Sequence, residues 1–385
     1  MPSKIITVCE QNTCTGCMAC INACPKAAIA INDSIEAFNA EIDQEKCIHC
    51  GLCEKVCPNI SALQLHTPIF WKQGWAENAI RRNSSSGGAA SAIIKNFISS
   101  GGYVASCLFE NGEFGFSITN DLVEARRFAG SKYVKSNPER IYQGVKQLLK
   151  EGKKVLFLGL PCQSAAVQNI CGEKENLYTA DLICHGTPSP KLLKQFMAEN
   201  RIDWSRINDI KFRESEYFGL ESNGVRLTPR RVQDSYLRLF LHSVDYTENC
   251  YSCRYATIDR VSDITLGDAW GQLSDTVSGG VSLVLCQTQK GIDLIESAGL
   301  HLEDVDLDKA VKANHQLEHP SLKHPGRTKF FNELKGGHNI RRATVAVFPK
   351  ESIKQSIKTG LIKAHLLKDS SPGVLPVKGT VKNNK

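Results

Sequence analysis

The sequence has no apolar run that approaches the length of a membrane-spanning helix, although 42% of its 385 residues are hydrophobic. Its first residues, MPSKIITVCEQ, lack the charged, apolar and small-residue zones of a signal peptide. No G-x-G-x-x-G motif follows a strand-like segment, which argues against a dinucleotide site of the Rossmann type. We therefore expect a cytoplasmic protein of two or three domains, for which membrane association is not favoured.

Charge is unevenly distributed along the chain. Residues 1–66 carry four Lys and seven Asp or Glu, a balance near −3, whereas residues 350–385 carry eight Lys against two acidic residues, a balance near +6. The net charge of +7 is therefore largely a property of the tail. A solvated tail is favoured over contact with an acidic partner or anionic lipid, and we expect no nucleic-acid binding.

Sixteen cysteines in such a chain favour metal or redox use over disulfides. The spacing C-x2-C-x2-C-x3-C-P occurs twice, and it is typical of two-cluster 4Fe-4S ferredoxins, in which the fourth Cys ligates the other cluster. The expected ligands are Cys14, Cys17, Cys20 and Cys57 for cluster one, and Cys47, Cys50, Cys53 and Cys24 for cluster two. Zinc, which usually takes separated C-x2-C pairs, is the weaker alternative. Cys9 falls outside the spacing and is expected to be a spare thiol.

Beyond residue 68 strand-like and helix-like segments alternate, for example KVLFLGL followed by PCQSAAVQNI. This predicts an α+β ferredoxin module at residues 1–67, then a larger α/β domain at residues 68–345 with a mixed, largely parallel sheet. Residues 346–385 are expected to form a basic C-terminal helix and a disordered tail. Ile353, Ile357 and Leu361 give that helix one apolar face, which we expect to pack on its own domain rather than on an acidic partner or a membrane.

Two stretches of the α/β domain suggest ligand contacts. In NSSSGGAASAI, Ser86, Gly87 and Gly88 precede a helix, so they could cradle a phosphate or act as an ordinary N-cap. In AGSKYVKS, Lys132 and Tyr133 offer a cation and an aromatic ring to a charged planar ligand. Taken by itself, Lys132 is more simply explained as a solvated surface lysine.

Four further cysteines lie in the α/β domain. Cys162 and Cys184 follow apolar strands, at the edge where open α/β sheets bind ligands. Cys250 and Cys253 form one C-x2-C pair, which is two ligands short of a metal site. The four could join to hold a third 4Fe-4S cluster, a zinc knuckle is an alternative, and so are buried apolar thiols.

The order of S-G-G, G-S-K-Y, G-L-P-C-Q, D-L-I-C-x-G-T-P-S, K-F-R, C-x2-C and D-I-x-x-G-D-x-W-G resembles the beta subunit of coenzyme F420-reducing hydrogenase and dehydrogenase. The resemblance spans about residues 75 to 290. It implies FAD bound around Ser86, Gly87, Gly88 and Lys132, and it raises the expectation of metal at the four further cysteines. It also places Asp268 and Trp270 near that site, without assigned roles.

Two functions of different class follow. The leading one is an iron–sulfur flavoprotein oxidoreductase that passes electrons from the ferredoxin clusters to FAD, and then to deazaflavin or another organic acceptor. Its partners would be a redox protein or reduced ferredoxin and a small organic acceptor, with Arg213 and His185 as candidates for the substrate pocket. The alternative is an electron-transfer subunit of a hydrogenase or formate dehydrogenase complex, with no substrate of its own. An adaptor without flavin is disfavoured by the intact motifs.

Overall fold

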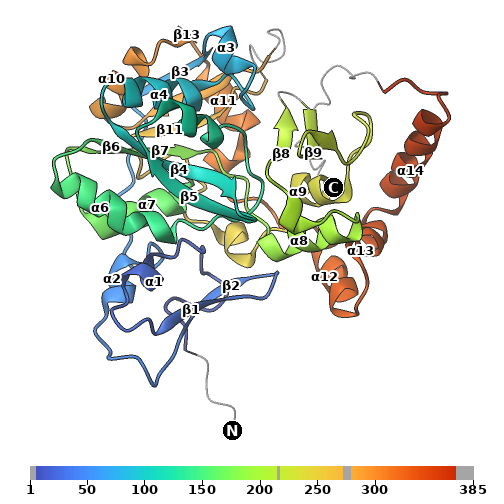
Figure 1. Ribbon diagram of the computed structural model, residues 1–385, viewed down its shortest axis with the longest axis horizontal. Coiled ribbons are helices and arrows are strands. Elements are labelled where there is room, and N and C mark those ends of the chain that lie inside the picture. The colour runs from blue at the N-terminus through green and yellow to red at the C-terminus, as the bar shows by residue number, and fades with distance from the viewer. Residues whose placement is uncertain (1–5, 215–216, 272–278, 370–385) are drawn as a thin grey trace.

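The computed structural model describes residues 6–214, 217–271 and 279–369 (Figure 1). The N-terminal region is a small α+β unit. Its strands β1 (Ile29–Asp33) and β2 (Phe38–Ile42) pair as an antiparallel hairpin. Its two short helices, α1 (Ala19–Ala23) and α2 (Leu52–Val56), each contain the third cysteine of one triplet and contact each other.

An eight-stranded sheet forms the centre of the larger α/β domain. Its strands, in spatial order, are β13 (His301–Glu303), β3 (Phe70–Trp75), β12 (Ser282–Cys286), β11 (Ile264–Asp268), β7 (Leu177–Leu182), β6 (Val155–Gly159), β4 (Tyr103–Glu110) and β5 (Glu113–Thr119). The pairs β11–β7, β7–β6 and β6–β4 are parallel, and the remaining pairs towards both edges are antiparallel. The predicted fold class is confirmed, with parallel pairing confined to the middle of the sheet.

Helices cover both faces of this sheet, which explains why its central strands are apolar throughout. All five residues of β6 are buried. Leu156 and Leu158 pack with α4 (Ala89–Ser99) and α10 (Gln289–Ser297) on one face. Val155 and Phe157 alternate with them and pack with α6 (Tyr142–Lys150) and α7 (Pro161–Cys171) on the other. The ferredoxin-like region lies beneath that second face, where α1 and α2 contact α7 (Figure 1).

A second core lies beside the sheet. It is built by the three-stranded antiparallel sheet of β8 (Ile210–Glu214), β9 (Tyr217–Ser222) and β10 (Val225–Arg226), and by helices packed on it. These helices are α8 (Pro190–Glu199), α9 (Ser235–Leu241), α12 (Arg327–Lys335) and α13 (Ile340–Val347). The other short elements are α3 (Asn78–Arg81), α5 (Leu122–Ala125), α11 (Leu307–Ala313), and the 3₁₀ turns Arg126–Phe128, Glu139–Ile141, Trp204–Arg206, Glu248–Ser252 and His315–Leu317.

The expected C-terminal helix is α14 (Pro349–Lys363), which contacts α13 at one side of the molecule (Figure 1). The expectation that its apolar face packs on its own domain is wrong. Ile353 and Ile357 are 61% and 59% exposed, because α14 meets the rest of the chain through α13 and through polar side chains of another face, Ser352 and Gln355, which bond to Arg238 and Gln233. The part of the expected disordered tail at residues 370–385 lies outside the described residues.

Among the described residues, no helix has the length and apolarity needed to cross a membrane.

Candidate redox sites

The second cysteine motif lies at the surface of the ferredoxin-like region. Its loop leads into α2 through Gly51, whose positive φ of 71° gives the tight turn next to the ligands. Cys50 is exposed, while Cys24, Cys47 and Cys53 are half-buried. The sulfur of Cys24, at the end of α1, accepts a hydrogen bond from the backbone N–H of Ala28 at 3.3 Å. The ligand set predicted for cluster two is therefore accessible from outside.

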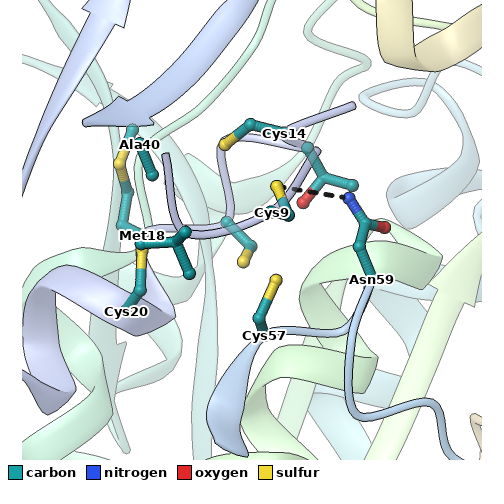
Figure 2. A pocket seen from close by; sticks show the side chains of 10 residues that line it. Cys9, Cys14, Met18, Cys20, Ala40, Cys57 and Asn59 are labelled. Atoms are coloured by element: carbon teal, nitrogen blue, oxygen red, sulfur yellow. Dashed lines mark hydrogen bonds between the residues drawn. The ribbon is translucent and has the colours of Figure 1, made fainter. Parts of the chain in front are cut away.

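The ligand set predicted for cluster one is buried. Cys14, Cys17, Cys20 and Cys57 are only 6–7% exposed, and they line one cavity (Figure 2). Burial raises the pKa of the Cys17 thiol, and it raises the pKa of Cys20 to about 12. Thiolates at this depth need a strongly positive group to stabilise them. Four sulfurs, three from the first motif and one from the second, around one cavity are the donor set that a cubane cluster requires.

Cys9 lies in the same cavity, which the motif spacing did not indicate. Its side chain points between Cys14 and Cys57 (Figure 2), and the Asn59 amide nitrogen lies 4.0 Å from its sulfur. Hydrogen bonds with the Cys14 and Cys57 thiols lower the pKa of Cys9 and raise the pKa values of those two partners. The cavity of cluster one therefore contains five thiols rather than four.

The fold brings together the four cysteines of the α/β domain, which we call the Cys162 group: Cys162, Cys184, Cys250 and Cys253. Cys162 is in the first turn of α7, directly after β6, and Cys184 follows β7. Cys250 and Cys253 belong to the 3₁₀ turn Glu248–Ser252 and its C-cap.

Electrostatic coupling links the members of the Cys162 group. Burial raises the pKa of Cys162 well above its usual value, and Cys253 and Cys184 raise it further. Burial, with Cys250 and Cys253, raises the pKa of Cys184 to about 12. The hydroxyl oxygens of Thr187 and Thr247 lie 3.8 Å and 3.7 Å from the Cys250 sulfur. Four thiols from three separate segments thus lie close enough to act on one another's pKa values.

The spacing of these sulfurs bears on the zinc alternative. Within residues 6–214, 217–271 and 279–369, no group of three or more His, Cys, Asp or Glu side chains lies as close as a single metal ion requires. Zinc–sulfur bonds of about 2.3 Å would bring four sulfurs within about 4 Å of one another. A cubane distributes its ligands over four iron atoms and needs wider spacing. Both the zinc alternative and the third cluster therefore stay predictions.

Three side chains of the larger domain connect cluster one to the Cys162 group. The Tyr142 hydroxyl on α6 donates to the carbonyl of Cys17, and the Tyr255 hydroxyl donates to the carbonyl of Pro58 at 3.2 Å. Lys135 is buried, and its ammonium donates to the carbonyl of Thr15 at 2.9 Å. The same ammonium acts on the pKa values of Cys162, Cys184 and Cys253, which it lowers. Lys135 therefore lies between the two sites. The sequence predicted a role for Lys132, three residues earlier, and none for Lys135.

A large pocket opens on the other side of the Cys162 group. Its empty space, including the open mouth, is about 1500 Å³, and Cys184 is part of its wall. Ser86 and Gly88 line it at the N-terminus of α4, where Gly88 has a φ of 86°. Gly87 is tightly confined, since a Cβ there would lie 2.5 Å from the Gly74 carbonyl oxygen and 2.6 Å from the Ser282 nitrogen. The S-G-G stretch thus brings bare backbone to the pocket wall.

The predicted Lys132 also lines this pocket, but its ammonium is engaged with the chain. It donates to the carbonyls of Phe128 at 2.7 Å and Ala129 at 3.0 Å. Burial lowers the pKa of Lys132, so the interpretation as a solvated surface lysine is wrong. Its charge is held beside the cavity by backbone carbonyls, and Tyr133 next to it stacks on Phe240 with ring centroids 4.5 Å apart.

Arg213, Asp268 and Trp270 meet at one wall of the pocket. The guanidinium of Arg213 donates twice to the Asp268 carboxylate, at 2.7 Å and 3.0 Å. It also lies over the rings of Phe218 and Trp270, 4.8 Å and 5.3 Å from their centroids. A bidentate pair stacked on aromatic rings is rigid, and it forms a fixed part of the pocket wall.

His185 lines the pocket immediately after Cys184. Burial, together with His315, lowers the pKa of His185 to about 4, so its ring is neutral at neutral pH. The Gln316 amide nitrogen lies 2.8 Å from the His185 Nδ1 and fixes the ring orientation. Gln316 was not indicated by sequence, because it lies far along the chain from the motif that contains His185.

Comparison with protein families gives two matches. Residues 152–308 match the family described as the C-terminal part of the coenzyme F420 hydrogenase/dehydrogenase beta subunit. Residues 13–60 match the 4Fe-4S dicluster domain. The first match covers β6 to α11 and includes all four members of the Cys162 group, and the second includes the eight predicted ligands of clusters one and two.

Among curated proteins, the chain is similar to the F subunit of the F(420)H(2) dehydrogenase of Methanosarcina mazei, with 23% identity over 304 residues that cover 71% of this chain and 82% of that protein. It is also similar to the B subunit of the ion-translocating oxidoreductase complex of Methanosarcina acetivorans, with 49% identity over 51 residues, 13% of this chain and 17% of that protein. Among solved structures, a chain of the F420-reducing [NiFe] hydrogenase complex from Methanosarcina barkeri aligns with a TM-score of 0.42 and 14% identity, over 68% of this chain and 97% of that one.

Proposed function

Because the chain joins a 4Fe-4S dicluster domain to a domain of the coenzyme F420 hydrogenase/dehydrogenase beta-subunit family, we propose that it is an iron–sulfur flavoprotein oxidoreductase. In this proposal the second cysteine motif and Cys24 would hold cluster two, and the buried set around Cys57 would hold cluster one. The Cys162 group would hold a third 4Fe-4S cluster and the large pocket FAD, which together would supply a route for electrons from cluster two to the flavin. The final acceptor is deazaflavin or another small organic molecule.

One observation carries the proposal: Cys184 belongs both to the Cys162 group and to the wall of the large pocket. It couples electrostatically to Cys250 and Cys253, and it lines the wall of the pocket. On the far side of the Cys162 group, Cys162 couples to Cys17 of cluster one. This supports an order of sites that would run from the exposed loop of Cys50 to a pocket large enough for a dinucleotide. This order is what electron transfer from a protein partner to an organic molecule requires.

The chemistry of the pocket walls suits FAD. The backbone around Ser86, Gly87 and Gly88 at the positive end of α4 would hold the pyrophosphate. When bound, the flavin supplies exchange between one-electron and two-electron transfer. Arg213 would orient a planar or anionic group, and the Asp268 carboxylate holds its guanidinium in place.

The neutral ring of His185, fixed by Gln316, is available to hold a proton at a single ring nitrogen beside the same pocket. The apolar members of the wall, such as Leu160, Leu182 and Leu266, exclude water from the reacting groups.

We further propose that residues 1–67, 68–345 and 346–385 act as ferredoxin domain, flavin-binding reductase domain and tail, in the cytoplasm and without nucleic acid or membrane. A redox protein such as reduced ferredoxin would dock at the exposed loop of cluster two. The alternative function is an electron-transfer subunit that passes electrons to or from a catalytic partner and has no substrate of its own. It would contain the same clusters as the proposed enzyme. It differs in having no turnover in isolation.

The test is anaerobic purification followed by iron, sulfide and flavin counts on the same sample. About twelve irons and one FAD per chain are expected, and turnover with a reduced viologen and a deazaflavin would separate the enzyme from the electron-transfer alternative. About eight irons would remove the third cluster. Absence of flavin even after reconstitution with FAD would refute the flavoprotein proposal.

A further inference from the structure

Cys9 is fixed by the backbone, not by chance packing, in the cavity of cluster one. Thr7 forms an isolated β-bridge with Glu41, and the backbone N–H of Val8 donates to the carbonyl of Ala40 at 2.9 Å. The Thr7 hydroxyl also donates to the Cys9 carbonyl at 2.6 Å. These contacts attach residues 7–9 to the edge of β2, whose hairpin forms one wall of the ferredoxin-like region. The Cys9 side chain therefore has a defined direction, into the cavity (Figure 2).

The neighbours of the Cys9 sulfur are groups of the cluster site itself. Cys9 is 8% exposed, and its side chain lies in the cavity between Cys14 of the first motif and Cys57 of the second (Figure 2). Asn59, two residues after Cys57, donates to the Thr13 carbonyl at 2.6 Å and brings its amide nitrogen to 4.0 Å from the Cys9 sulfur. An apolar residue would fill this corner equally well if packing were the only requirement. A thiol here instead adds a fifth potential ligand. It lies beside Cys14, the first cysteine of the first motif, and Cys57, the last cysteine of the second motif.

We propose that Cys9 is a reserve ligand of cluster one, able to take the iron coordinated by Cys57 or by Cys14. In the exchange, the Cys9 thiol loses its proton to solvent and forms an Fe–S bond, while the bond from iron to the displaced cysteine breaks and that sulfur takes up a proton. One thiolate replaces another, so the cluster keeps its charge and its electron count. No oxidant or reductant is needed.

The inference rests on the proposed cluster one. Cys9 lies outside the repeated cysteine spacing, so the two motifs supply four ligands for that cluster without it. It distinguishes two classes among the cluster-one cysteines. Cys14 and Cys57 contact Cys9 and are replaceable. Cys20 lies on the side of the cavity next to Met18, away from the position of Cys9 between Cys14 and Cys57 (Figure 2), and is not replaceable.

The experiment compares full-length variants purified anaerobically: C57A, C9A, the double variant C9A/C57A, and C20A as the matched control. Iron and sulfide are counted, and the EPR spectrum of the reduced protein is recorded. We expect C57A and C9A to keep the wild-type iron content, with an EPR signal of cluster one that is shifted in C57A. We expect C9A/C57A and C20A each to lose about four irons, the content of one cubane.

Equal iron loss in C57A and C9A/C57A would overturn the reserve role at Cys57, and the pair C14A and C9A/C14A then tests the other contact in the same way. If both single variants lose cluster one as fully as their doubles, the proposal is wrong. Retained cluster-two signal in every variant shows that the ferredoxin-like region has folded. A wild-type protein without cluster one would refute the proposed function itself, so the two failures are distinguishable.

Discussion

Removing the charge of Lys135 should lower the reduction potentials of the clusters on either side of it. Lys135 is 5% exposed, its stem lies against Gly16 of the first cysteine loop, and its ammonium donates to the Thr15 carbonyl at 2.9 Å. On the other side, burial raises the pKa values of Cys162, Cys184 and Cys253, and the Lys135 ammonium partly offsets this. Each reduction adds one negative charge to a cluster, and a buried cation nearby stabilises that charge.

The size of the effect follows from Coulomb's law. For a separation on the order of 8 Å and an effective dielectric constant of about 20, the interaction is about 2 kcal/mol. For a one-electron couple this corresponds to a potential lower by roughly 90 mV in Lys135→Met. The shift should be present at cluster one and at the third cluster, and it should be small at cluster two, which lies at the surface and is better screened.

The assay is an anaerobic redox titration followed by EPR, with Lys135→Arg as the matched control. The arginine keeps the charge and the donor to Thr15, so its potentials should stay close to those of the wild type. Iron counts confirm that both variants hold the same clusters. Potentials in Lys135→Met within about 20 mV of the wild type would refute the reasoning, because a buried cation at this position could not then be acting on the clusters.

The remaining predictions address the third cluster, the flavin and pH. Cys162→Ala should lose about four irons per chain in iron counts. The control Cys286→Ala removes a buried thiol far from any motif and should lose none. Gly87→Ala should weaken FAD binding at least tenfold in fluorescence titrations, because its Cβ meets backbone atoms, while Gly115→Ala, with open space, should bind normally. Burial raises the pKa of Asp245 well above its usual value, and neither carboxylate oxygen has a partner among the described atoms. The folded state thus keeps a proton that the unfolded chain releases above about pH 4, and stability falls as pH rises through the folded pKa. Asp245→Asn should therefore raise the melting temperature more at pH 8 than at pH 5, and an equal gain at both would contradict this.

The ferredoxin motifs could be interpreted from the sequence because their ligands are encoded locally. Three cysteines at fixed spacing wrap one face of a cubane, and the backbone between them has few alternatives. The place of Cys9 in the cavity could not be predicted in this way, because a β-bridge between Thr7 and Glu41, which are distant in sequence, brings it there. Its spacing from Cys14 carries no information about that bridge.

In the larger domain, local sequence patterns predict the strands but not which segments meet at the site. The strands before Cys162 and Cys184 were recognisable as apolar runs, and the parallel pairing of β6 with β7 brings their ends to one edge. Which other segments meet them there depends on tertiary contacts that no periodicity encodes. Lys132 and Lys135 illustrate this: they are three residues apart in one loop, yet one lines the pocket and the other lies between cluster sites.

The distribution of burial constrains where a protein partner can deliver electrons. Every predicted ligand of cluster one is 6–7% exposed, and the loops that hold two of them are fastened to the larger domain by Tyr142, Lys135 and Tyr255. In the Cys162 group Cys250 is buried, the other three cysteines are half-buried, and Cys184 lines the pocket. Only the loop of cluster two presents a ligand cysteine, Cys50, at the surface of the described chain. Since electron transfer weakens steeply with distance, a partner that docked elsewhere would face a protein wall. In the proposed function, this distribution would confine exchange with proteins to the loop of cluster two and exchange with small molecules to the pocket.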